Sequence, residues 1–435
     1  MGLCKKCNQK NAEFIWCKTC NAKRFQQNFE NWTSGNNDID KFIQNTQLLA
    51  SKSEKVLEWI PYDRFYDIEY IAKGGFGKIY KAIWTDGFIT NWDNEKQNWK
   101  RICQDKDVAL KSLNNSKNVT VEFLNEITSH HKIEDNFSII NIYGITQEPE
   151  TKNYMIILDY AEHGSLRNYL DIRYNKISWY TKVHDLWRIA YGLKKIHGKE
   201  LIHRDLHIGN ILYFSNYVSI TDIGLCKPAN YDKLENKNSK NTLYGVLPYI
   251  APEVLREQGY TKAADIYSFG IIMYEVISGL PPYHDVSHDI NLAIEICRGL
   301  RPRFNIKVPQ LIVELIKRCL DANPLNRPKA NEIEFTLYKW WSWFDSQIEL
   351  KKQIKEAEEI NNNLLTNNNS ISLCCLSYKT HSEAVYTSRL LNFNNLPEPK
   401  NTDEYYMQND NIINMQFSES LQIDISLLDI NNNVS

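Results

Sequence analysis

The 435-residue chain has little of what a membrane-spanning or secreted protein needs. Its longest mostly apolar stretches, such as residues 269–277, are far too short to span a bilayer, and no apolar signal-peptide core lies near the N-terminus. Gly2 follows Met1 as in a myristoylation signal, but Lys6 stands where that signal needs Ser or Thr. We therefore expect no transmembrane segment and an intracellular, cytoplasmic protein.

The sequence also lacks an excess of charge of either sign. It has 51 Lys and Arg against 53 Asp and Glu, a net charge of −2. No overall basic field would attract nucleic acid or an anionic membrane, so we expect neither partner. Hydrophobic residues make up 43%, enough for a large core, and the length suits one large domain with additions or two to three ordinary domains.

Ten cysteines without a secretion signal indicate reduced thiols, and four of them form two CxxC pairs near the N-terminus: Cys4, Cys7, Cys17 and Cys20. One CxxC pair binds Zn²⁺ from one side, and a second pair completes a closed four-sulfur site. Bound metal would supply the folding energy that so short a segment cannot obtain from a core. The alternative is a disordered leader with reduced thiols. We predict a structural zinc module, similar to a zinc knuckle, where a protein partner could bind.

A short polar loop between two apolar runs carries the chemistry of the chain. It presents Asp205 and, five positions later, Asn210, and Asp222 follows the next apolar run. Phosphoryl transfer needs a carboxylate that orients and deprotonates a hydroxyl, and an amide and a second carboxylate that hold metal on the phosphates. An Asp in a turn is often only a turn former, so these residues need further support from the rest of the chain.

The sequences His203-Arg204-Asp205-Leu206, with Asn210, and Asp222-Ile223-Gly224 resemble the catalytic-loop and metal-binding motifs of protein kinases. The resemblance covers roughly 280 residues and implies the tyrosine-kinase-like group, of the Ser/Thr type. The Cys module, a Trp-rich excursion and the phrase that ends in Ala251-Pro252-Glu253 are also similar to a large expanded fungal set of such kinases. The implied fold is α+β and bilobal, with a small lobe of five antiparallel strands and a larger helical lobe.

The resemblance assigns the parts that bind ATP and Mg²⁺. Lys111, in the strand motif Val-Ala-Leu-Lys, would contact the phosphates and pair with Glu126 on the following helix, with Glu122 as the competing partner. Asn210 and Asp222 would hold Mg²⁺. Glycines let backbone N–H groups approach phosphates closely. The expected nucleotide-binding residues are Ile71, Ala72, Gly74, Gly75, Phe76, Gly77, Ile79, Ala109, Lys111, Leu158, Asp159, Ala161, Leu212 and Asp222, with Leu158 as gatekeeper.

Three positions depart from the kinase pattern. His207 stands where Ser/Thr kinases usually carry a Lys that contacts the transferred phosphate, so the site loses a fixed positive charge. Ala72 replaces the first glycine of the phosphate-covering loop, and Ile223 replaces Phe in Asp-Phe-Gly. We expect the second and third changes to be tolerated, whereas His207 is counted with the catalytic residues.

The activation segment offers three acceptor hydroxyls, Ser239, Thr242 and Tyr244, and Arg204 would bind the added phosphate. Phosphorylation there, by the kinase itself or by an upstream kinase, is a hypothesis. Arg327 is expected to pair with Glu253 inside the large lobe, where loss of either partner would leave a buried charge.

We predict four regions. A Cys₄ zinc module spans 1–24, a linker with an amphipathic helix capped by Asp38 spans 25–64, the kinase domain spans 65–344, and an Asn-rich, mostly disordered tail spans 345–435. Trp84, Trp92 and Trp99 are expected to form a small cluster in an elongated excursion after the second strand.

The predicted function is transfer of the ATP γ-phosphoryl group to Ser/Thr hydroxyls of protein substrates. The alternative is a pseudokinase or adaptor that binds nucleotide and recruits partners through the Cys module. The presence of Lys111, Glu126, Asp205, Asn210 and Asp222 favours activity, whereas His207 and Ala72 favour the alternative.

Overall fold

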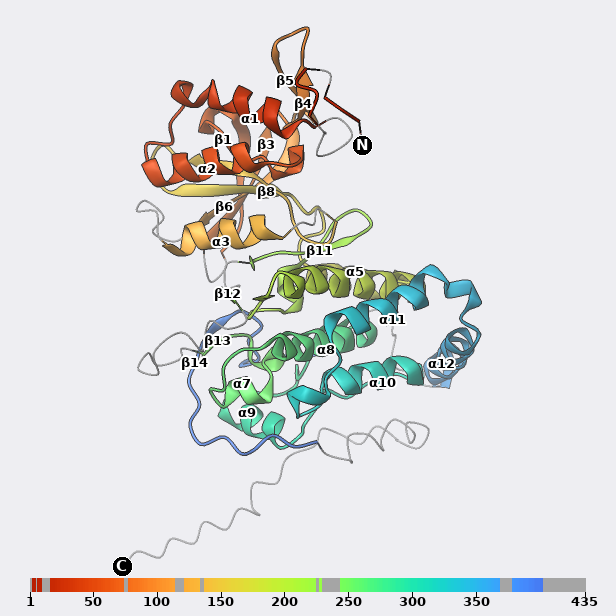
Figure 1. The fold of residues 1–435 in the computed structure, drawn as a ribbon. Helices are drawn as coiled ribbons and strands as arrows, with labels where there is room; N and C mark the ends of the chain where they lie inside the picture. The colour runs from red at the N-terminus through yellow and green to blue at the C-terminus, as the bar shows by residue number, and fades with distance from the viewer. Residues whose placement is uncertain are drawn as a thin grey trace, which may run out of the picture.

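A sheet-based small lobe lies above a larger helical lobe in the computed structural model of the chain (Figure 1). The structure describes residues 2–4, 6–9, 16–73, 77–113, 121–133, 137–223, 227–228, 243–367 and 378–401. Within these ranges, none of the helices is both long enough and apolar enough to cross a membrane.

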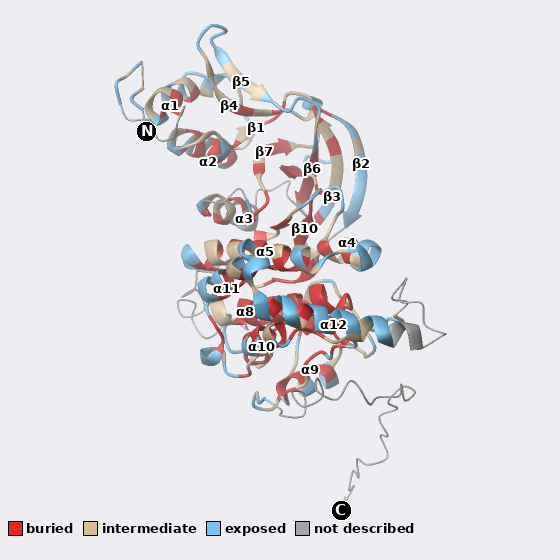
Figure 2. Cartoon of the chain, turned by 90° about the vertical axis from the view of Figure 1, so that its right-hand side faces the viewer, coloured by how far each residue is buried: buried red, intermediate tan, exposed pale blue. Residues whose placement is uncertain are grey.

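The small lobe is organised around a six-stranded sheet with strand order β1-β7-β8-β6-β3-β2. Strand β8 is buried along its whole length. Strand β2, at the edge, is mostly exposed (Figure 2). Helix α3 (Val121–Lys132) adds Ile127 to the core on one face. The strands are β1 (Glu58–Trp59), β2 (Phe65–Lys73), β3 (Gly77–Trp84), β6 (Lys106–Leu113), β7 (Ile142–Gln147) and β8 (Tyr154–Asp159).

The sixth strand corrects the predicted sheet of five antiparallel strands. Strands β2, β3, β6, β8 and β7 pair antiparallel, but β1 adds to β7 in parallel, with Trp59 opposite Ile145. Strand β1 has two residues and precedes the predicted domain boundary. A two-residue strand is too short for a periodic pattern, so the sequence gives no signal for it.

The Trp-rich excursion forms a hairpin of strands β4 (Phe88–Asp93) and β5 (Asn98–Ile102). Trp92 and Trp99 meet edge to face there, with ring centroids 5.2 Å apart. Trp84, by contrast, is fully buried in the core of the main sheet, beside Tyr143. The predicted cluster of three tryptophans is therefore wrong for Trp84. Its side chain points into the core of the main sheet, away from the other two tryptophans, although it is close to them in sequence.

Two helices before the sheet pack on it and on the hairpin. Helix α1 (Lys18–Gln26) and residue Trp16 share a core with Val56 and Ile89. Helix α2 (Asn37–Leu49) buries Ile39 and Ile43 against the sheet. Its N-cap is Asn36, whose side chain accepts hydrogen bonds from two backbone N–H groups, and not the predicted Asp38.

The large lobe surrounds helix α8 (Lys262–Ser278), which is buried almost from end to end (Figure 2). An all-round apolar helix of this kind belongs in a core. Around it lie α4 (Leu166–Arg173), α5 (Trp179–Gly198), α7 (Pro252–Leu255), α9 (Ile290–Cys297), α10 (Gln310–Cys319) and α11 (Ala330–Ser342). Short strands form the lobe junction: β9 (Leu201–Ile202), β10 (Ile211–Tyr213), β11 (Val218–Ile220), β12 (Lys227–Pro228) and β13 (Leu243–Gly245).

Part of the tail is ordered, contrary to the prediction of a mostly disordered tail. Helix α12 (Ile348–Asn367) packs Leu350 and Ile354 into the core of the large lobe and extends through most of the Asn-rich run. Residues 378–401 follow the surface of the large lobe and include strand β14 (Arg389–Leu391), which pairs with β13 (Figure 1). Apolar residues spaced among polar ones anchor both segments, and the low average hydrophobicity of the tail conceals them.

Candidate active site

The catalytic loop is held by its own apolar residues and by one buried carboxylate. Leu201, Leu206 and Ile208 are buried in the core of the large lobe. Between them, Asp265 at the start of α8 accepts hydrogen bonds from the backbone N–H groups of His203 (2.8 Å) and Arg204 (3.0 Å). Arg204 has a left-handed backbone with φ of 73°, which is costly for a residue other than glycine. The two bonds to Asp265 stabilise this conformation and fix the residue that follows, Asp205.

Asp205 lies almost completely buried at the centre of the site. The Nδ2 of Asn210 donates to its backbone carbonyl over 2.9 Å, which ties the two predicted functional residues together. Burial raises the pKa of the Asp205 carboxyl to about 6, because a buried carboxylate is poorly solvated. Its Oδ1 is buried with no hydrogen-bond partner among the described residues, and its Oδ2 accepts a hydrogen bond from the Ser388 hydroxyl at 2.7 Å.

Lys111 and Asp222 meet from opposite lobes. The Lys111 Nζ on β6 lies 2.7 Å from Asp222 Oδ1, and the lysine side chain is only 8% exposed. Burial alone would raise the pKa of Asp222, but the adjacent Lys111 ammonium outweighs it and the pKa is lowered. The Asp222 carboxylate is therefore ionised at neutral pH. The Glu126 side chain lies outside the described residues, so its pairing with Lys111 stays a prediction.

The predicted apolar nucleotide residues gather in one cluster at the lobe junction. Ala109, Leu158 and Ala161 are buried there, and Ile79 and Leu212 pack against them. The Asp159 carboxylate is occupied by Tyr143, Asn141 and Lys106, and its backbone N–H donates to the Asn141 carbonyl over 3.3 Å. Ile71 and Ala72 lie on the exposed part of β2, and Gly77 begins β3. Gly74, Gly75 and Phe76 lie outside the described residues.

The donor set at the junction fits Mg²⁺. Asn210 and Asp222 offer an amide and a carboxylate, and the backbone N–H of Thr221, beside Asp222, donates to the carbonyl of Asn210 over 2.9 Å. Oxygen donors of this kind, together with phosphate, are those that Mg²⁺ prefers. Asp222 has a left-handed backbone with φ of 61°, a strained conformation typical of functional sites.

Comparison with known proteins agrees with this geometry. Residues 67–337 match the family model described as "Protein tyrosine and serine/threonine kinase", which is more than half of the chain. The chain belongs to this protein kinase family. The match confirms the predicted kinase domain with a sheet-based lobe, and the family implies ATP and Mg²⁺ as cofactors.

Curated relatives of this kinase come mainly from Dictyostelium discoideum. The protein named Probable serine/threonine-protein kinase gdt8 is 28% identical over 332 residues, which cover 75% of this chain and 24% of the relative. The RGS domain-containing serine/threonine-protein kinase A is 29% identical over 270 residues, 61% of this chain and 21% of the relative. The Dual specificity protein kinase pyk3 is 26% identical over 334 residues, 75% of this chain and 22% of the relative. The chain thus spans about a quarter or less of the length of these relatives.

His207, the main departure from the kinase pattern, is buried and neutral. Its Nδ1 accepts a hydrogen bond from the Gly209 N–H over 3.1 Å, so Nδ1 carries no proton. Burial lowers the pKa of His207 to about 4. The neutral ring therefore carries its proton on Nε2, which faces the Ser388 hydroxyl at 3.2 Å. The kinase has a hydrogen-bond donor here, but not a cation.

Ser388 is the residue at the site that the sequence analysis missed. It lies in the tail, 183 positions after Asp205, within a polar segment that matches no kinase motif. Of the three predicted phosphoacceptors, Ser239 and Thr242 lie outside the described residues. Tyr244 lies on β13, and its hydroxyl donates to the backbone carbonyl of Ser388 over 3.1 Å.

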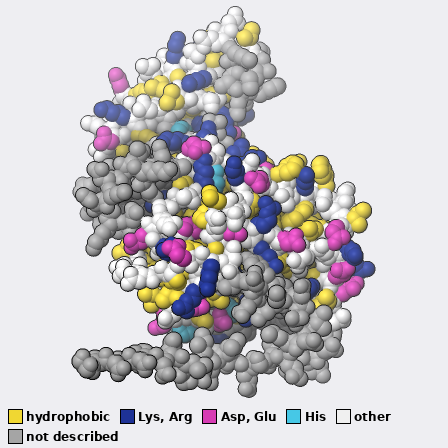
Figure 3. All heavy atoms as spheres, turned by 60° about the horizontal axis from the view of Figure 1, so that its bottom comes forward, with side chains coloured by type: hydrophobic (Ala, Val, Ile, Leu, Met, Phe, Trp, Pro, Cys, Tyr) yellow, Lys and Arg dark blue, Asp and Glu magenta, His cyan; other side chains and the backbone are white. Residues whose placement is uncertain are grey.

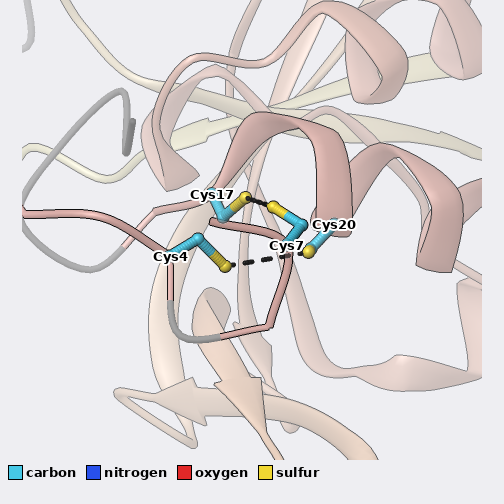
Figure 4. Close-up of side chains that lie close together, drawn as sticks. All are labelled: Cys4, Cys7, Cys17 and Cys20. Atoms are coloured by element: carbon cyan, nitrogen blue, oxygen red, sulfur yellow. Dashed lines mark hydrogen bonds between the residues drawn. The ribbon is translucent and has the colours of Figure 1, made fainter. Parts of the chain in front are cut away.

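The four N-terminal cysteines come together as predicted (Figure 4). The Sγ atoms of Cys4 and Cys20 are 3.8 Å apart, those of Cys7 and Cys17 are 3.5 Å apart, and all four lie within 4.8 Å of one another. Four sulfurs at about 2.3 Å from a central Zn²⁺ in a tetrahedron would be about 3.8 Å apart. The backbone N–H groups of Lys6 and Cys7 lower the pKa of the Cys4 thiol to about 6. The sulfur spacing fits one zinc ion.

Proposed function

We propose that this chain is an active protein kinase that transfers the γ-phosphoryl group of ATP to Ser and Thr hydroxyls of protein substrates. The main observation in support is the contact between Lys111 and Asp222 across the two lobes, with Asp205 fixed beside them. Lys111 would hold the phosphates, and Asn210 and Asp222 would hold Mg²⁺, which supplies charge neutralisation on the phosphates when bound. Asp205 orients the acceptor hydroxyl and takes its proton.

Two observations support Ser/Thr as the acceptor type. The side chain of Ser388, the residue just before β14, reaches the Asp205 carboxylate at 2.7 Å, which is the depth that a short acceptor needs. Two of the relatives reported above are named as Ser/Thr kinases, whereas a third is named a dual-specificity kinase. We also assign the chain to the tyrosine-kinase-like group, with affinity to its expanded fungal set and a kinase domain over 65–344. Proteins are the expected substrates.

The distribution of surface charge gives little support for selection of substrates by their net charge. Figure 3 shows acidic and basic side chains interspersed on the face it presents, rather than separated by sign. A mixed surface gives weak long-range steering. Contacts within the substrate groove are then the more promising source of selectivity.

The decisive experiment measures phosphate incorporation from Mg-ATP by the purified full chain and by its Asp205→Asn variant. General-base loss should lower incorporation by roughly 10²-fold or more. Asp265→Asn is unsuitable as a control because it disturbs the loop, whereas Asp345→Asn alters an exposed ion pair and should have no effect. Equal incorporation by the wild type and Asp205→Asn would refute the catalytic assignment and favour a pseudokinase.

We propose in addition that phosphorylation of the activation segment switches the kinase. Arg204, next to Asp205, lies 4.6 Å above the ring of Tyr260, whose hydroxyl donates to the Tyr244 carbonyl over 2.8 Å. A phosphate near Tyr244 would thus meet a guanidinium that is linked to the catalytic loop. Replacing Ser239, Thr242 and Tyr244 by Ala, Ala and Phe should reduce activity, and unchanged activity would refute the switch.

We propose that the cysteine cluster holds one structural Zn²⁺ and offers a surface to a protein partner. Zinc thiolates and reduced thiols are typical of the interior of a cell, where we expect this kinase to act. The full chain should contain about one zinc per molecule, and Cys17→Ser should lose it, because a closed site needs four ligands. Cys103→Ser, at an exposed cysteine away from the cluster, is the matched control. Equal zinc contents in the two variants would contradict the proposal.

A further inference from the structure

The tail segment 378–401 follows the large lobe and passes through the active site. Strand β14 pairs antiparallel with β13, which lies within the activation segment of residues 222–253 (Figure 1). The pairing aligns Leu391 with Leu243 and Arg389 with Gly245. An extended peptide added to an exposed strand edge is a common mode of peptide recognition. The tail therefore occupies the kind of edge on which a protein substrate would lie.

Side-chain contacts on both sides of β14 fix its register. Leu391 and Leu396 are buried in the core of the large lobe. Before the strand, the Tyr386 hydroxyl donates to the Pro282 carbonyl over 2.9 Å. At its start, the Arg389 guanidinium donates to the His288 carbonyl over 2.6 Å. After it, Glu398 forms an ion pair with Arg256. Because these anchors lie on either side of residue 388, the backbone cannot slip by one position without losing several of them at once.

This register places the Ser388 hydroxyl against the catalytic base. Its Oγ donates to Asp205 Oδ2 at 2.7 Å and lies 3.2 Å from His207 Nε2, whose proton points to it because Nδ1 is the acceptor for Gly209. One oxygen thus donates to the base and accepts from a neutral donor. This arrangement orients a lone pair of the oxygen, as a nucleophile requires.

We propose that Ser388 is an intramolecular phosphoacceptor of this kinase, presented to its own active site by the tail strand. The inference rests on the proposed kinase activity. In the transfer, the Ser388 Oγ–Pγ bond forms while the bond from Pγ to the β,γ-bridging oxygen of ATP breaks. The Ser388 proton passes to Asp205, and ADP leaves with the electron pair of the broken bond. While β14 is in place, another substrate cannot pair with the same edge of β13.

The adjacent hydroxyl provides an internal control. Thr387 is exposed and lies outside β14, whereas the Ser388 hydroxyl contacts Asp205. A threonine in a flexible tail would be as good an acceptor as the serine next to it. If the tail docks as described, only Ser388 is presented to Asp205.

The experiment uses the full chain, treated with phosphatase and then given Mg-ATP. Phosphorylated positions are mapped by mass spectrometry in the wild type and in Ser388→Ala, Thr387→Ala and Asp205→Asn. A peptide that spans residues 382–394 is added in trans to the full-chain variant Leu391→Asp, in which the buried anchor of β14 is lost and the edge of β13 is open. Phosphorylation of this peptide reports catalytic competence separately. The initial rate per molecule is measured over about a tenfold range of protein concentration, because an intramolecular reaction does not depend on it.

The expected result is phosphate on Ser388 at a rate per molecule independent of concentration, lost in Ser388→Ala and unchanged in Thr387→Ala. Phosphorylation of the added peptide without phosphate on Ser388 of the chain would overturn the inference and leave the proposed function standing. A rate per molecule that rises with concentration would overturn the intramolecular route. Incorporation into neither tail nor peptide by any of the proteins would instead refute the proposed function, and the inference with it.

Discussion

The buried pair of Arg327 and Glu253 should carry a large part of the stability of the substrate platform. Arg327 donates to both Glu253 carboxylate oxygens at 2.7 Å, and its side chain is fully shielded from solvent. It also donates to the carbonyls of Asp321 (2.8 Å) and Ala263 (2.9 Å), so that one guanidinium links three segments of the lobe. Glu253 is the second residue of helix α7, which follows β13 after a short 3₁₀ turn at residues 247–249. The pair thus anchors the segment between β13 and α7, which lies beside the catalytic loop, to the rest of the large lobe.

Arg327→Met leaves the Glu253 charge buried without its counter-ion, and such a loss costs about 3–5 kcal/mol. At roughly 2–4 °C per kcal/mol for a lobe of this size, the melting temperature should fall by roughly 6–20 °C. Arg318→Met is the matched control. Its ion pair with Glu332 is exposed and 4.0 Å long, so its removal should cost about 0–1 kcal/mol.

The assay is urea unfolding of the full chain, followed by tryptophan fluorescence, for Arg327→Met, Glu253→Met and the double variant. The second replacement removes the buried charge that the first one leaves without a partner. The double variant should therefore lose less unfolding free energy than the two single variants together, by about 2 kcal/mol or more. Strict additivity, or a cost for Arg327→Met no larger than that for Arg318→Met, would refute the reasoning.

Three further predictions concern the active site and the cysteine cluster. His207→Lys should raise turnover near neutral pH, because His207 is neutral there and a lysine restores a fixed charge beside the transferred phosphate; a fall in turnover in a steady-state assay would show that the neutral donor has its own role. His207→Gln should reduce the loss of unfolding free energy at acid pH. The pKa of His207 is about 4 when folded and about 6.5 when unfolded, so the free energy of unfolding falls as pH drops from 6.5 towards 4, by up to about 1.4 kcal/mol per pH unit, and urea titrations at pH 7, 6 and 5 should show less of this fall in the variant. Metal removal with a chelator should lower the melting temperature of the wild type, because Trp16 next to the cluster packs on the small lobe, and should leave Cys17→Ser unaffected; a wild type that ignores the chelator contradicts this.

The residues of the candidate site could be picked from the sequence because they sit in contiguous motifs. Asp205 and Asn210 lie five positions apart in one loop, and Lys111 and Asp222 each follow or lie within an apolar strand. Phosphoryl transfer accepts few residue types at such positions, so the residue types themselves indicate the site. Lys111 and Asp222 are 111 positions apart and in contact in the structure, and the sequence between them does not indicate this contact.

The features that were not predicted depend on the backbone or on a choice between equivalent residues. Strand β14 docks through main-chain pairing and through scattered side-chain anchors that form no motif, and Ser388 reaches Asp205 only because of the resulting register. Strand β1 is similar, with two residues and no pattern. Asn36 and Asp38 are equally good caps by type, and only the path of the chain decides between them. The loss of a fixed positive charge at His207 was expected from the residue type, but the burial that lowers its pKa is expressed by no motif.

The packing of the N-terminal helices on the sheet has a consequence for synthesis on the ribosome. The Tyr154 hydroxyl donates to the Ser34 carbonyl across 120 positions, and α2 buries Ile39 and Ile43 against strands β7 and β8. At roughly 5–20 residues per second, these strands leave the ribosome about 6–24 s after the segment they cover. During that interval α2 lacks these two strands as packing partners. Residues 34–43 are thus covered in full only after the chain has been made as far as residue 159.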